Sequence, residues 1–145
     1  GRLPLFLAKN PGIESGYMIA HVTASALASE NKTLSHPASI DSMPTSGGQE
    51  DLVSMAPWSG YKLLAIQQNV IKILAIEMLV SCAAHYLCHT KLEAGNGTSC
   101  IINAARSVLK ISKGDRGLSD EINKLVSIIS GGELLSKLKK ENYLE

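Results

Sequence analysis

Three polar residues, Gln49, Glu50 and Asp51, end a long polar segment of this 145-residue chain, just ahead of a strongly apolar stretch. A carboxylate there could take and return protons as a general acid or base, if its surroundings tune its pKa. Adjacent carboxylates at the start of a helix also complement the helix dipole and cap free N–H groups. From residue types alone we favour this capping role, with a short helix expected over about residues 49–55.

A second group of residues has metal-ligand chemistry: Cys82, His85, Cys88 and His89. Spacings of three and four residues would place Cys82, His85 and His89 on one face of a helix. The chain has no H-E-x-x-H motif and no second ligand cluster, and cysteine is also a common small core residue. We therefore interpret this face as core and expect no metal site.

The composition is that of an ordinary globular domain, with 45% hydrophobic and 19% charged residues. A net charge of +1 offers no electrostatic attraction for nucleic acid or an anionic membrane, so we expect neither as a partner. Three cysteines without a C-x-x-C pair argue against a disulfide framework and favour the cytoplasm. The length suits a single helical domain over residues 1–145.

Apolar residues recur with the period of helices, and no segment alternates with a period of two, so we predict an all-α fold. Helices are expected over about residues 13–31, then in a long stretch that has no glycine or proline from Lys62 to Cys88, and then over about residues 100–112, 119–130 and 133–140. The first is rich in alanine and serine, which permit close packing, so we expect it to be interior with His21 buried. Ser119 is the expected N-cap of the fourth, and Asn96-Gly97 the expected turn before the third.

The longest expected helix is apolar around most of its circumference, and Pro57 suits its first turn. Lys72 and Glu77 interrupt its apolar run, which favours a buried core helix over a membrane span. At 1.5 Å per residue it is roughly 40 Å long, too long for one domain of this size to cover. We infer that it is buried against other chains, or against another part of the same protein.

The polar loop between the first two helices covers about residues 33–50. Pro37 and Pro44 push the residues before them out of the helical region, and Gly47-Gly48 permits a tight turn. A loop of this length in a compact domain is usually either functional or disordered. His36 lies within it, in the same loop as the first candidate site.

Several short strings follow one another through the first 51 residues: Asn10-Pro11-Gly12, Ser15-Gly16-Tyr17-Met18-Ile19-Ala20, Ser29-Glu30-Asn31-Lys32, His36-Pro37-Ala38-Ser39, Pro44-Thr45-Ser46 and Gln49-Glu50-Asp51. This run resembles the C-terminal part of histidine ammonia-lyase, in the aromatic amino acid ammonia-lyase family. The similarity is dense from about Leu3 to Met55 and looser to the end of the chain. It implies a bundle of long helices, histidine metabolism, and elimination of ammonia from histidine to give urocanate.

The resemblance also implies roles for two residues of the polar loop. In the family, the glutamate matching Glu50 lies in the active site, near the substrate amino group and the prosthetic group, with the glutamine matching Gln49 beside it. Glu50 is therefore the expected catalytic residue, able to attract a cationic amine or to move protons, and Gln49 the expected substrate-binding residue. Asp51 is expected to be a structural cap. Leu52 stands where histidine lyases often have histidine, which leaves the exact substrate open.

The family's electrophile, a methylidene-imidazolone group made from Ala-Ser-Gly, has no precursor here. The nearest strings are Ala24-Ser25-Ala26 and Ala28-Ser29-Glu30. The resemblance implies that this cofactor comes from a missing N-terminal part, and that the isolated chain is inactive.

Relatives of this kind are tetramers with long helices at their centre. The resemblance therefore implies a homo-oligomer, a dimer or tetramer, or pairing with a separate N-terminal lyase chain, or both. The alternative hypothesis is a non-catalytic helical oligomerisation or interaction remnant of the family.

Overall fold

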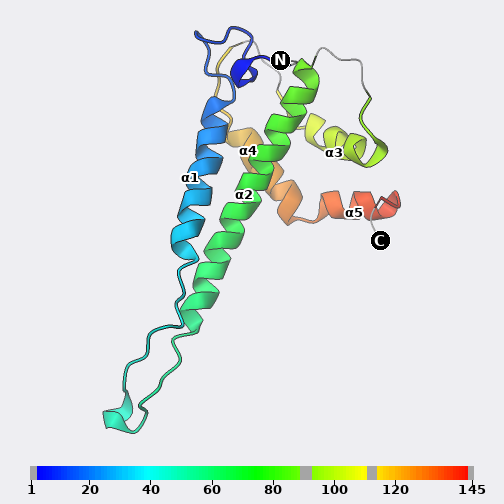
Figure 1. Ribbon diagram of the computed structural model, residues 1–145. Coiled ribbons are helices and arrows are strands. Elements are labelled where there is room, and N and C mark those ends of the chain that lie inside the picture. The colour runs from blue at the N-terminus through cyan, green and yellow to red at the C-terminus, as the bar shows by residue number, and fades with distance from the viewer. Residues whose placement is uncertain (1–2, 89–92, 111–113, 144–145) are drawn as a thin grey trace.

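The computed structural model describes residues 3–88, 93–110 and 114–143, and within these ranges the chain is all-α, with no β-strand (Figure 1). Its elements are η1 (Leu5–Leu7), α1 (Met18–Leu34), η2 (Ser46–Gly48), α2 (Pro57–Leu87), α3 (Asn96–Arg106), α4 (Ser119–Ser130) and α5 (Glu133–Lys140), where η denotes a 3₁₀-helix. The predicted fold class is confirmed.

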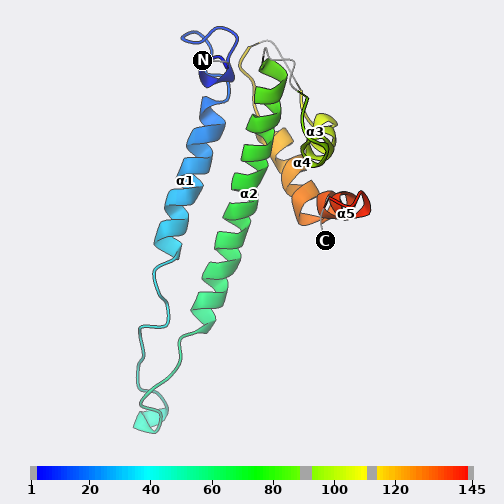
Figure 2. The same cartoon turned by 45° about the vertical axis from the view of Figure 1, so that its right-hand side comes forward.

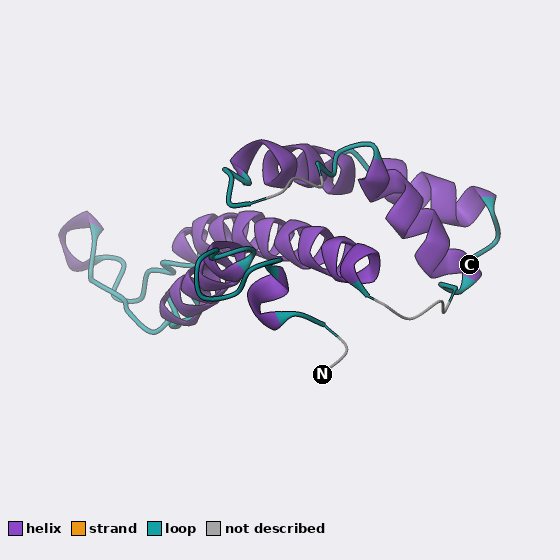
Figure 3. Cartoon of the chain, turned by 90° about the horizontal axis from the view of Figure 1, so that it is seen from above, coloured by secondary structure: helices purple, strands orange, loops and turns teal. Residues whose placement is uncertain are grey.

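Helices α1 and α2 form an antiparallel pair, and the loop that joins them projects beyond both at one end (Figures 1 and 2). Helix α4 packs against α2, and α3 and α5 contact each other beside it. Viewed from above, α3, α4 and α5 gather in one group beside α2 (Figure 3). The molecule is thus a long helical pair with a small helical cluster at the end opposite the projecting loop.

Helix α2 begins at Pro57, as predicted, because proline needs no N–H partner in a first helical turn and its φ is already helical. At 1.5 Å per residue its 31 residues extend for about 46 Å. Its buried residues all lie between Asn69 and Ala83. They pack with residues of α3, α4 and the segment that follows α3 to form the core: Ala75, Met78, Leu79, Cys82, Ile102, Ala104, Ala105, Val108 and Leu125.

Apart from the face that packs on α1, the first half of α2 stays largely uncovered by the described residues. Trp58, Tyr61, Leu63 and Leu64 are each more than half exposed, and the rings of Trp58 and Tyr61 meet edge to face. By length and composition alone α2 could cross a bilayer, a test that the core helix of a globular protein also passes. The structure agrees with the inference that this chain cannot cover its longest helix by itself.

Helix α1 is exposed, contrary to the prediction that it lies in the interior. Ala20 is its buried residue, and His21, expected to be buried, faces solvent. The physical reason is that α1 packs mainly along α2. Its other faces have little contact with the described residues. Ile19 and Val22 are more than half exposed for the same reason.

Several expected helix boundaries differ from the structure: α1 begins at Met18 and not near residue 13, and α3 ends at Arg106 and not near residue 112. Asn96 and Gly97 open α3 instead of forming a turn before it, and Leu118, not Ser119, is the N-cap residue of α4. The first turn of α4 carries Asp120 and Glu121, which suit the positive end of the helix dipole. Glu121 is buried, however, and its role goes beyond the helix dipole.

A polar junction joins the N-terminal segment to the C-terminal helices. The buried carboxylate of Glu121 forms a two-pronged ion pair with Arg116 and accepts a hydrogen bond from the backbone N–H of Lys110 at 2.7 Å. The neighbouring Asp115 accepts hydrogen bonds from the backbone N–H groups of Ser15 and Gly16 at 2.8 and 2.7 Å. Asp115 therefore links two segments of the chain that lie about a hundred positions apart.

We predict that Glu121→Gln lowers the free energy of unfolding by about 3 kcal/mol, because it leaves the Arg116 guanidinium without its counter-charge. The matched control is Asp120→Asn, an exposed carboxylate one position earlier in the same helical turn, expected to cost less than about 1 kcal/mol. Urea denaturation followed by circular dichroism measures both. Equal losses for the two variants would contradict the assignment.

Candidate functional site

The loop of residues 35–56 is held together by a few specific hydrogen bonds. Near its base, Lys62 of α2 donates to the carbonyl of His36. Midway along, the hydroxyl of Ser42 donates to the carbonyl of Val53 at 3.0 Å and accepts from its N–H at 2.8 Å. These bonds keep the two legs of the loop side by side.

The tip of the loop is a tight turn that presents Glu50. Thr45 and Glu50 pair through their backbones, with N···O distances of 2.9 and 3.4 Å. Between them Ser46, Gly47 and Gly48 have φ of 57°, 66° and 90°, and glycine enters this left-handed region at least cost. The Thr45 hydroxyl also donates to the Glu50 carboxylate at 3.2 Å.

The predicted short helix over residues 49–55 is wrong. The turn at the tip consumes the backbone N–H groups of Gly48, Gln49 and Glu50, and that of Val53 is bonded to Ser42. Helix α2 starts six residues after Asp51, so Asp51 does not cap it. The prediction that Glu50 and Asp51 cap a helix is therefore wrong.

Gln49, Glu50 and Asp51 all lie exposed at the tip of the loop, at the far end of the chain from α3, α4 and α5 (Figure 1). The apolar side chains near them are bare as well, with Ile40 72% and Leu52 82% exposed. Single exposed apolar residues are common, but here they accompany a loop that its own chain leaves uncovered. Any closed site around Glu50 would thus require walls from outside the described residues.

The cysteine and histidine group of α2 does not converge in the described residues. Cys82 is buried in the core, and this burial raises the pKa of its thiol, while His85 is exposed. His89 lies outside the described residues. Across the ranges that the structure describes, no three His, Cys, Asp or Glu residues come close enough to hold a metal ion.

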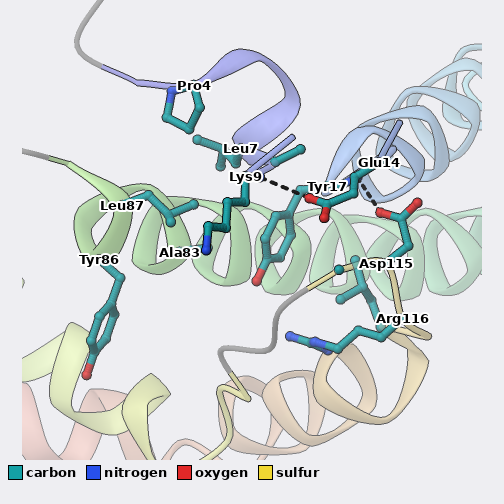
Figure 4. Close-up of a pocket in the computed structure, with 14 residues that line it drawn as sticks. Pro4, Leu7, Lys9, Glu14, Tyr17, Ala83, Tyr86, Leu87, Asp115 and Arg116 are labelled. Carbon is teal, nitrogen blue, oxygen red and sulfur yellow. Dashed lines mark hydrogen bonds between the residues drawn. The ribbon is translucent and has the colours of Figure 1, made fainter. Parts of the chain in front are cut away.

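The sequence analysis missed the polar cluster at the other end of the α1–α2 pair. Tyr17, Arg116 and Glu121 meet there beside a pocket of about 570 Å³ (Figure 4). Burial raises the pKa of the Tyr17 hydroxyl, the nearby Glu121 adds to the rise, and Arg116 opposes it. The available signal was an arginine five residues before a glutamate at the start of a helix, a spacing that allows a pair but does not predict its burial.

The chain matches the family described as "Aromatic amino acid lyase" over residues 1–107, and it belongs to that family. Among its relatives, the histidine ammonia-lyase of Bartonella henselae is 45% identical over 138 residues, covering 95% of this chain and 27% of the relative. The histidine ammonia-lyase of Burkholderia pseudomallei (strain K96243) is 52% identical over 108 residues, covering 74% of this chain and 20% of that protein. The predicted resemblance is confirmed.

Solved structures agree with this assignment. Histidine ammonia-lyase from Trypanosoma cruzi superposes with a TM-score of 0.88 at 40% identity, over 96% of this chain and 27% of that one. Tyrosine aminomutase from Streptomyces globisporus superposes with a TM-score of 0.90 at 31% identity, over 99% and 27%. The chain thus spans about a quarter of the length of these relatives and corresponds to a C-terminal portion of them.

We predict that Ser42→Ala loosens the loop without changing the helical core. Losing the hydrogen bond from the Val53 N–H to the Ser42 hydroxyl should speed hydrogen exchange at the Val53 amide about fivefold, since one net hydrogen bond contributes on the order of 1 kcal/mol. Ser39→Ala, an exposed serine in the same loop, is the control. Exchange measured by NMR at equal rates in both variants would contradict this role for Ser42.

Proposed function

We propose that this chain carries Glu50 into a composite active site that eliminates ammonia from histidine to give urocanate. The remaining machinery comes from a separate N-terminal chain or segment. The single observation that carries the proposal is the exposed tip of the loop: Glu50 is presented by a defined turn, and among the described residues it caps no helix and has no wall around it. Membership of the family and similarity to histidine ammonia-lyases support the choice of reaction.

The reaction asks for a group of this kind. Elimination must remove a weakly acidic hydrogen from the carbon next to the one bearing the amine, and must expel that amine. A carboxylate can hold the cationic amino group or exchange protons with the substrate. Glu50 would do this, and the neighbouring Gln49 would donate or accept hydrogen bonds with polar atoms of the substrate.

The methylidene-imidazolone group supplies the family's electrophile, and this chain does not contain its source. The sequence has no Ala-Ser-Gly string, so we infer that the group is contributed from elsewhere. The residues at the tip suit a place beside it, as polar partners of the substrate, and do not suit a role as its precursor.

The exposed apolar surface supports an assembly as the working form. Trp58, Tyr61, Leu63 and Leu64 are bare apolar side chains around the half of α2 nearest the loop that carries Glu50, and together they are called the bare apolar patch. Covering such a patch is favourable by about 25 cal/mol per Å² of apolar surface. We propose that a homo-oligomer, a dimer or tetramer, or the N-terminal partner covers it.

Coexpression tests the composite site. The purified chain alone should form no urocanate from histidine. Combined with the N-terminal three quarters of the Bartonella henselae histidine ammonia-lyase, it should restore urocanate formation, followed by ultraviolet absorbance. Glu50→Gln should reduce that restored rate at least a hundredfold, within the range ascribed to positioned acid–base groups.

The matched control is Asp51→Asn, the adjacent exposed carboxylate, which should leave the restored rate within about threefold of the unchanged chain. Co-purification of the two parts shows that they assemble in every variant. Assembly without urocanate, or equal rates for Glu50→Gln and Asp51→Asn, would refute the proposed role of Glu50.

The second candidate is a non-catalytic oligomerisation or interaction protein, and the bare apolar patch on α2 favours it equally. Leu64→Glu should shift the purified chain toward monomer in analytical ultracentrifugation, because it places a charge in the surface to be buried. Ser81→Glu, an exposed position further along α2, is the control and should leave self-association unchanged. A chain that is monomeric before substitution would exclude self-association as its role.

A further inference from the structure

A pocket of about 570 Å³ lies at the end of the molecule opposite Glu50 (Figure 4). Its walls come from the N-terminal segment, the last turns of α2 and residues 114–118. This volume falls within the range of small-molecule sites, which are mostly apolar with a few polar groups that converge. The pocket is therefore large enough for one compact organic ligand.

One side of the pocket is apolar. Leu7 of the N-terminal segment faces Ala83 and Leu87 of α2 across it, with Pro4 at the edge (Figure 4). The ring of Tyr86 closes the lower side, where the guanidinium of Arg106 lies 5.6 Å from its centroid. These walls favour a ligand with an apolar body.

The carboxylates around the pocket are already engaged with the protein. Glu14 accepts hydrogen bonds from the backbone N–H groups of Lys9 and Asn10, both at 3.1 Å, and Asp115 accepts from two backbone N–H groups of the N-terminal segment. Glu121, just beyond, is paired with Arg116. A cationic ligand would have to compete with these bonds.

Two side chains that line the pocket, Lys9 and Tyr17, can donate hydrogen bonds to a ligand. Within the described residues no acceptor is bonded to the ammonium group of Lys9 (Figure 4). Tyr17 lines the pocket near Arg116, whose guanidinium can only donate, so it does not compete for the hydroxyl proton of Tyr17. Burial raises the pKa of this hydroxyl, which keeps the proton in place at neutral pH.

We infer that this pocket binds a small organic carboxylate, with its apolar body against Leu7, Ala83 and Leu87 and its carboxylate held by Lys9 and Tyr17. A charge-assisted bond from an ammonium is roughly twice as strong as a neutral one, so the charge of the ligand should decide its affinity. This inference is independent of the proposed reaction and of Glu50.

The test uses the full chain with 2-naphthoate and its uncharged analogue 2-naphthamide, by calorimetry and protein-observed NMR. 2-Naphthoate should bind with a dissociation constant below about 1 mM, a modest value for a ligand of this size. It should bind at least about tenfold more tightly than 2-naphthamide. Amide shifts should be centred on Leu7, Ala83 and Arg116.

Lys9→Met keeps most of the length of the side chain and removes its charge. In this variant 2-naphthoate should bind only as tightly as 2-naphthamide does. Tyr17→Phe should weaken 2-naphthoate about threefold. Lys139→Met, an exposed lysine on α5, is the control and should have no effect. Circular dichroism confirms that each variant is folded.

Equal affinity for the two ligands, or an unchanged affinity in Lys9→Met, would overturn the inference. So would the absence of binding at millimolar 2-naphthoate, or shifts centred on the bare residues Trp58, Leu63 and Leu64 of α2. None of these outcomes bears on whether Glu50 acts in ammonia elimination, which the coexpression experiment decides separately.

Discussion

The packing of α1 and α4 against one apolar helix, α2, is the interaction on which the rest of the structure depends. Between Asn69 and Ala83 this helix finds cover in its own chain and forms the core. Before Asn69 it finds little, and large apolar side chains remain bare. The fold therefore has a covered end, where α2 is packed into the core, and a bare end, where the loop of residues 35–56 projects. The loop with Glu50 lies at the bare end, and the pocket lies at the covered end.

At the bare end, the polar loop of residues 35–56 is shaped by hydrogen bonds between its two legs and not by burial. Ser42 and Thr45 each bond across to the opposite leg, and three consecutive residues of positive φ turn the chain between the legs. A loop built this way can hold a carboxylate in a defined place without a core beneath it. The same geometry explains why no described residue forms a wall around Glu50.

At the covered end, hydrogen bonds and an ion pair of charged side chains connect the segment before α1 to the C-terminal helices. Asp115 binds backbone N–H groups before α1, and Arg116 neutralises the buried Glu121. Gly16 is required there because a Cβ at this position would lie 2.5 Å from the carbonyl oxygen of Phe6. The carboxylates of the junction are engaged with the protein, while the side chains of Lys9 and Tyr17 line the pocket.

The sequence by itself determined the all-α class, the start of α2 at Pro57, the last helix after Gly131-Gly132 and the family, because helical period, proline, glycine and short motifs act locally. Only the tertiary structure decided that residues 49–55 form no helix, that α1 is exposed and that Glu121 is buried. These depend on partners far along the chain: Val53 bonds to Ser42, and within the described part of the chain α1 packs mainly along α2. Local patterns carry no information about such pairings, since the free energy of each depends on which segments meet.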